Sequence, residues 1–125
     1  MKIESISSAS APKAIGPYSP AVKIGGTVYC SGQLGLDPAS GELASGVKAQ
    51  ADRAILNLQA LLSAAGLGLH NVAKTTIFLA DMADFSVVNE VYAANFAAPY
   101  PARSTVQVAG LPKGGLVEIE AIALA

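Results

Sequence analysis

Three charged residues near the carboxyl end of the chain have the types and spacing to act on a small carboxylate: Arg103, Glu118 and Glu120. An arginine presents a planar pair of N–H donors that binds a carboxylate through two parallel hydrogen bonds. A glutamate nearby could position a water molecule for attack. The same charges could instead form a cross-strand ion pair, and spacing alone favours that structural interpretation.

The other reactive side chains do not assemble into a familiar catalytic group. With one histidine, His70, and one cysteine, Cys30, the chain cannot supply a His-rich metal site or a cysteine cluster. We expect His70 to be solvated or capping, and Cys30 to be a small buried hydrophobe in an apolar strand. Ser31-Gly32 lacks the GxSxG nucleophile pattern, and the glycines form no phosphate-binding motif. We therefore predict no metal site.

Composition narrows the partners and the compartment. The 125 residues suit one domain, 1–125, and a net charge of -1 gives no field to hold nucleic acid. Charged residues are 14% of the chain, against roughly 25% in average soluble domains, so we expect apolar surface to meet another subunit. No apolar run is long enough for a membrane span, and nothing resembles a signal peptide, which predicts a cytoplasmic protein.

Hydrophobic periodicity predicts the elements that must position the charged residues. Apolar residues recur at three- and four-residue steps in two segments, and β-branched or apolar runs mark the strands. The patterns predict a hairpin around Gly25-Gly26, a helix over 45–65, a strand over 72–80 buried on both faces, a helix capped by Asp84 and ended by Pro99 and Pro101, and strands over 103–109 and 116–124. This order indicates an α+β domain.

Strand alternation groups the charged residues by face. Residues two apart share a face, which places Arg103 with Thr105 and Gln107. The same rule places Glu118 with Glu120. Two helices can cover only one face of the sheet, and we expect both polar groups on the other, free face. The apolar residues of alternate parity are then expected to face the helices: Val106, Val108, Val117 and Ile119.

The segment from Pro101 to Ala123, PARSTVQVAGLPKGGLVEIEAIA, resembles the signature of the RidA (YjgF/UK114) family, with Arg103 and Glu118 at its two charged positions. Residues 14–43 are similar to the amino-terminal half of the family, and residues 72–92 to its middle. The resemblance implies a chorismate-mutase-like α+β fold, in which a mixed β-sheet with two helices on one face closes into a trimeric barrel. It also implies cofactor-free hydrolysis of 2-iminobutanoate and 2-iminopropanoate to 2-keto acids and ammonia.

The resemblance implies a site in clefts between the subunits of a homotrimer. The family's ligand-contacting positions carry over to residues of the expected type: Tyr18, Ser31, Asn89, Arg103 and Glu118. Arg103 would bind the substrate carboxylate, Glu118 would hold the water, and Tyr18 from an adjacent subunit would close the cleft. Thr105 occupies a substrate-binding position where many members have cysteine, which leaves the preferred imino acid open. Glu120 shares the face of Glu118, but only Glu118 has the family's spacing from Arg103.

Two alternatives to catalysis stay open at this point. The Arg103-centred clefts could bind 2-keto acids or other small carboxylates without turning them over. The chain could also act through protein contacts, because family members have been described as translation inhibitors, ribonucleases or chaperone-like proteins. The near-neutral charge argues against direct RNA cleavage.

Overall fold

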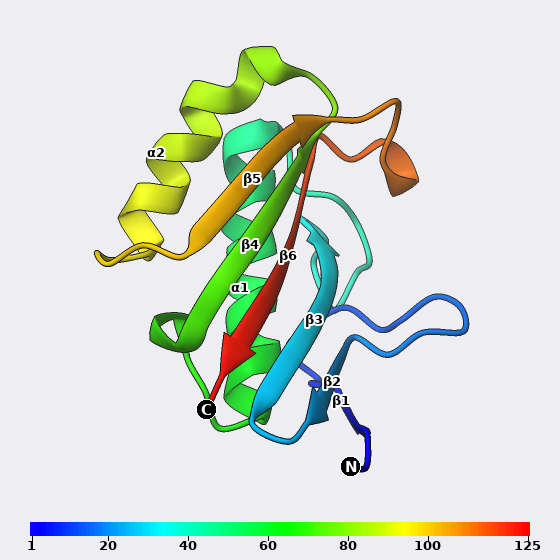
Figure 1. Cartoon of the computed structure of the whole chain (residues 1–125). Helices are drawn as coiled ribbons and strands as arrows, with labels where there is room; N and C mark the ends of the chain where they lie inside the picture. The colour runs from blue at the N-terminus through cyan, green and yellow to red at the C-terminus, as the bar shows by residue number, and fades with distance from the viewer.

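The computed structural model describes residues 1–125 as a mixed six-stranded sheet in the order β1-β2-β3-β6-β4-β5. Both helices lie against one face of this sheet (Figure 1). The main elements are β1 (Glu4–Ile6), β2 (Ala21–Ile24), β3 (Thr27–Leu34), α1 (Val47–Ala64), β4 (Val72–Leu79), α2 (Phe85–Asn95), β5 (Ala102–Gln107) and β6 (Val117–Leu124). β4 and β5 are parallel and all other neighbours are antiparallel, so the predicted α+β class and mixed sheet are confirmed.

The predicted elements are present, with two differences: the sheet has one additional strand, and another residue makes the capping bond before α2. Glycine at the hairpin turn is required because Gly25 has a φ of 58°, a conformation that other residues rarely adopt. The strand β1 was not predicted, since its three residues show no alternating apolar pattern. Asp84 precedes α2 as predicted, but its side chain makes no capping bond. The Asp81 carboxylate instead accepts from the Ala83 amide and caps the short turn before the helix.

Helix α1 packs so closely on the end of β3 that one contact requires glycine. A Cβ on Gly35 would lie 2.4 Å from the Gln50 Cα, so any side chain there would push the helix away. The buried Asn57 amide donates to the carbonyls of Leu34 and Leu36, at 3.1 and 2.9 Å. These contacts hold the carboxyl end of β3 in place against the helix. Neither helix is both long and apolar enough to cross a bilayer.

The two faces of the sheet are as predicted for β6. Val117 and Ile119 are fully buried against the helices, while Glu118 and Glu120 lie on the free face. In β4, the residues toward the helices are also buried, and those toward the free face are half-buried. The expectation that β4 is buried on both faces is therefore not met within one copy of the chain.

For β5 the predicted faces are wrong. Arg103 is the register partner of Thr75, whose fully buried hydroxyl is bonded to Tyr92 of α2, so Arg103 lies on the helix side. Thr105 and Gln107 share that side with it, whereas Val106 is 45% exposed on the free face. Alternation tells which residues share a face but not which face is covered. At the edge strand β5 the helices cover the face only partly, so polar side chains can lie beside α2.

Candidate functional site

Four of the candidate site residues line two separate pockets, each of about 410 Å³. One pocket contains Tyr18 and Glu118, and it opens between the loop after β1, strand β3 and the turn before β6. The other contains Arg103 and Asn89 and lies between α2 and the start of β5. The chain thus brings the predicted residues together in two groups, not in one.

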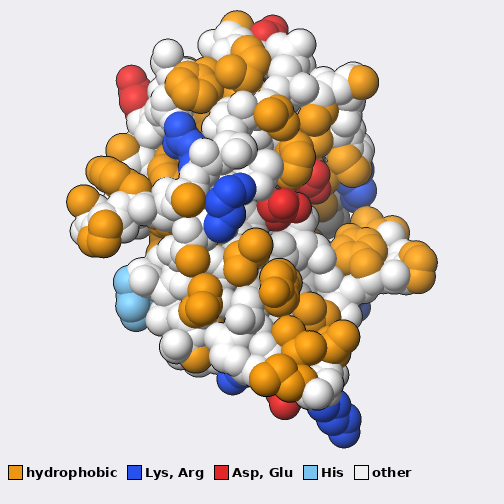
Figure 2. All heavy atoms as spheres, viewed as in Figure 1, with side chains coloured by type: hydrophobic (Ala, Val, Ile, Leu, Met, Phe, Trp, Pro, Cys, Tyr) orange, Lys and Arg blue, Asp and Glu red, His pale blue; other side chains and the backbone are white.

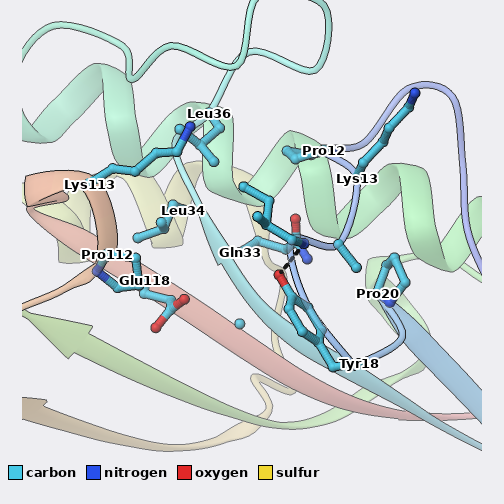
Figure 3. Close-up of a pocket in the computed structure, with 13 residues that line it drawn as sticks. Pro12, Lys13, Tyr18, Pro20, Gln33, Leu34, Leu36, Pro112, Lys113 and Glu118 are labelled. Atoms are coloured by element: carbon cyan, nitrogen blue, oxygen red, sulfur yellow. Dashed lines mark hydrogen bonds between the residues drawn. The ribbon is translucent and has the colours of Figure 1, made fainter.

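The Glu118 carboxylate packs directly on the backbone of β3. A Cβ on Gly32 would lie 2.7 Å from the Glu118 Cδ, so the glycine makes room for this side chain. The carboxylate is directed into the pocket, with Tyr18 across from it (Figure 3). Partial burial raises the pKa of Glu118, and the nearby negative charge of Glu120 raises it further. No local pattern around Gly32, beyond its place after Ser31, indicates this contact.

Tyr18 is held at this pocket by a loop anchored to β3. Its hydroxyl accepts a hydrogen bond from the Ile15 amide at 3.4 Å, and the side chain is 53% exposed. The Ser31 hydroxyl donates to the carbonyl of Ser19 at 2.7 Å. Ser31 does not line the pocket, so within one chain its hydroxyl anchors the Tyr18 loop.

Arg103 lies against aromatic rings and has no acidic partner. Its guanidinium carbon is 4.9 Å from the centroid of the Tyr92 ring and 5.7 Å from that of Phe85. The ion pair in the chain is formed elsewhere, between Lys48 and Asp52 on the surface of α1. The N–H donors of Arg103 are therefore left available for a carboxylate.

A cross-strand pair between Arg103 and Glu118, which spacing alone favoured, is wrong. Strand β4 lies between β5 and β6, and the two side chains are on opposite faces of the sheet. Arg103 therefore cannot hold Glu118 ionised within one chain, and the pKa of Glu118 is raised rather than lowered.

Of the remaining candidate residues, only Asn89 lines one of these two pockets. Asn89 lines the Arg103 pocket, three residues before Tyr92 and on the same side of α2. Thr105 lies on the helix side, and its buried hydroxyl has no hydrogen-bond partner. Cys30 is the buried hydrophobe that we expected, and burial raises its pKa to about 11. His70 lies in the turn Leu69–Asn71, outside both pockets.

The contact of the Tyr92 and Phe85 rings with Arg103 has no counterpart among the predictions from the sequence. Both belong to the apolar stripe of α2, which is typical of residues packed in a core. Their contact with Arg103 depends on the position of β5 beside α2, for which the sequence carries no local signal. No cluster of three or more His, Cys, Asp or Glu side chains that could hold a metal ion is present.

Comparisons with known proteins give one consistent relationship. The family model described as Endoribonuclease L-PSP matches residues 8–125. A protein from Bos taurus named 2-iminobutanoate/2-iminopropanoate deaminase is 57% identical over 120 residues, which cover 95% of this chain and 88% of that protein. The similarity extends through all the elements that carry the two pockets.

Solved structures share the whole fold. The RidA structure from an Antarctic Psychrobacter has a TM-score of 0.96 and 53% identity, covering 98% of this chain and 99% of that one. The structure of TdcF from E. coli with bound serine has a TM-score of 0.92 and 43% identity, covering 98% of both chains.

Proposed function

Because the chain belongs to the Endoribonuclease L-PSP family, which includes the RidA and YjgF proteins, we propose that it is a 2-iminobutanoate/2-iminopropanoate deaminase. It releases the corresponding 2-keto acid and ammonia. The observation that carries this proposal is the half-buried Arg103, whose guanidinium contacts two rings and no acid. A buried charge without a partner is costly, so a site that keeps one is suited to an anionic ligand.

Arg103 binds the carboxylate that every 2-imino acid carries. The planar fork of the guanidinium matches the two carboxylate oxygens and fixes the adjacent imine carbon in orientation. The bound serine in TdcF, a protein of the same fold, is itself a small 2-amino acid with such a carboxylate. Asn89, in the same pocket, can donate or accept a further hydrogen bond.

Glu118 holds the water that attacks the imine. Its carboxylate accepts a hydrogen bond from the water while the water oxygen bonds to the imine carbon and the C=N electron pair moves to nitrogen. One proton of the water passes by way of the Glu118 carboxylate to the imine nitrogen, which gives a carbinolamine. The carbinolamine then collapses: its hydroxyl proton passes to the nitrogen as the C–N bond breaks, so that ammonia leaves and the carbonyl forms. Tyr18, across the pocket from Glu118, closes the site and orients the imine.

Since Arg103 and Glu118 lie on opposite faces of one sheet, the complete site requires two copies of the chain. We propose that one copy supplies Arg103 and Asn89 and its neighbour supplies Tyr18 and Glu118, within a homotrimer that closes the free faces into a barrel. Figure 2 shows hydrophobic side chains spread over that free face. Tyr29 and Leu124, both about half exposed there at 45% and 48%, would be covered in such an assembly.

Imine hydrolysis is tested by generating 2-iminobutanoate in place with an amino-acid oxidase and following release of 2-ketobutyrate. We expect the protein to accelerate this release, and we expect full activity after exhaustive treatment with EDTA, because no residue of the mechanism needs a metal. Oxidase without the protein is the control for spontaneous hydrolysis. Binding of 2-ketobutyrate without any acceleration would assign a binding module instead, and loss of activity that a divalent cation restores would contradict the metal-free mechanism.

The pH dependence of the reaction is predicted to follow Glu118. Glu118 must be ionised to hold the water, so activity should be lost as the pH falls through the pKa of Glu118. Because that pKa is raised, the loss should begin at a higher pH than for an ordinary glutamate. Glu120→Gln removes the nearby negative charge, which lowers the pKa of Glu118, so the acid limb of the kcat/KM profile should move to lower pH. Glu4→Gln, which removes the same charge at the far edge strand, is the control. An unchanged acid limb in Glu120→Gln would show that Glu118 does not set it.

A further inference from the structure

The clamp for the substrate carboxylate includes more than Arg103. We propose that Tyr92, together with Phe85, is a positioning residue that holds the Arg103 guanidinium ready for the carboxylate; this inference rests on the proposed function. The two rings approach the guanidinium carbon at 4.9 and 5.7 Å, within the range of a cation–π interaction.

Tyr92 is itself fixed from two further directions. Its hydroxyl lies 2.8 Å from that of Thr75, which is fully buried on β4. Its ring stacks on Phe96, with centroids 4.2 Å apart and an interplanar angle of 19°. With 4% exposure, the ring has no room to turn. A rigid ring gives the guanidinium one defined surface to rest on.

Aromatic rings suit this task better than a carboxylate would. A carboxylate would occupy the N–H fork of Arg103 and neutralise the charge that the substrate needs. The ring faces attract the cation through their quadrupole and leave the N–H donors free. The interaction also lowers the entropy that Arg103 loses when substrate binds, since the side chain is already held in one place.

The test compares Tyr92→Leu with Tyr92→Phe by calorimetric titration of 2-ketobutyrate, together with KM and kcat for 2-iminobutanoate. Tyr92→Leu removes the ring, and we expect the Kd and the KM to rise together by roughly three- to thirty-fold, with a smaller change in kcat. Tyr92→Phe keeps the ring and loses only the contact with Thr75, so it should restore binding to within about two-fold of the parent protein. Val91→Ala, a truncation of the neighbouring buried residue of α2, controls for loss of stability alone.

If Tyr92→Leu fails to fold, Phe85→Leu gives the same comparison, because Phe85 is only half-buried and contacts Arg103 from the first turn of α2. Unchanged Kd and KM in a folded Tyr92→Leu or Phe85→Leu variant, or an equal loss in Val91→Ala, would overturn the proposal. Failure of the proposed function gives a different result, in which the parent protein hydrolyses no imine. The Kd of 2-ketobutyrate for the variants then still tests whether Tyr92 and Phe85 position Arg103.

Discussion

Arg103→Lys is expected to lower kcat/KM for 2-iminobutanoate by roughly thirty- to a thousand-fold, which corresponds to about 2–4 kcal/mol. Lysine keeps the positive charge, but its flexible ammonium cannot form two parallel hydrogen bonds to one carboxylate. It also stacks less well on the Tyr92 and Phe85 rings, so the charge is no longer held at one place. The loss should therefore exceed that of any substitution in the rings themselves.

The fold should tolerate Arg103→Lys, because no acidic side chain of the chain depends on Arg103. Thermal unfolding and sedimentation should match those of the parent protein. Arg53→Lys is the matched control: two guanidinium nitrogens of Arg53 donate to the Asn57 side chain, so this variant should lose a little stability and keep its activity. A folded Arg103→Lys protein with near-normal imine hydrolysis would contradict the carboxylate clamp.

The elements that carry the site could be predicted from the sequence because their signals are local. The apolar periodicity of α1 and the Gly25-Gly26 turn each depend on neighbouring residues, and both predictions are confirmed. Helix α2 ends at Asn95, before the prolines that were expected to end it, because Phe96 already has an extended backbone. The strand β1 was missed because it is defined by its pairing with β2, to which its three residues give no local clue.

The order of the strands could not be predicted in the same way. Strands β5 and β6 follow one another in sequence, which suggested that Arg103 and Glu118 lie on adjacent strands. The chain instead inserts β6 between β3 and β4 and places β5 at the edge. Such pairings are decided by long-range packing, and they determine the face toward which each side chain points.

Family resemblance identified the candidate residues but not their arrangement within one chain. It indicated Tyr18, Asn89, Arg103 and Glu118, and the structure divides them between two pockets. Tyr92 was not recognised because an aromatic residue in the apolar stripe of a helix ordinarily belongs to the core. Tyr92 does belong to the core, and its ring also contacts the Arg103 guanidinium. The alternation of residues along β5 does not predict that Arg103 faces the helices.

The second large effect concerns the division of the site between subunits. In the proposed site, Arg103→Ala removes the carboxylate clamp and Glu118→Gln removes the water-holding carboxylate, so the proposed trimers of either variant alone should be inactive. A mixed trimer can still contain an intact site, wherever the Arg103 half comes from a Glu118→Gln chain and the Glu118 half comes from an Arg103→Ala chain. In a random equimolar mixture this holds for about a quarter of the sites.

The measurement that tests the account most directly is the rate of 2-iminobutanoate hydrolysis by such mixed trimers, made by refolding the two variants together and purified through a different tag on each chain. Every trimer that carries both tags has one intact site of its three, so we predict that activity returns to about a third of the parent value per site. Each variant refolded alone under the same conditions serves as the control. If both residues acted within one chain, every site in the mixture would carry one defect. Mixed trimers as inactive as their parents would then contradict the shared site.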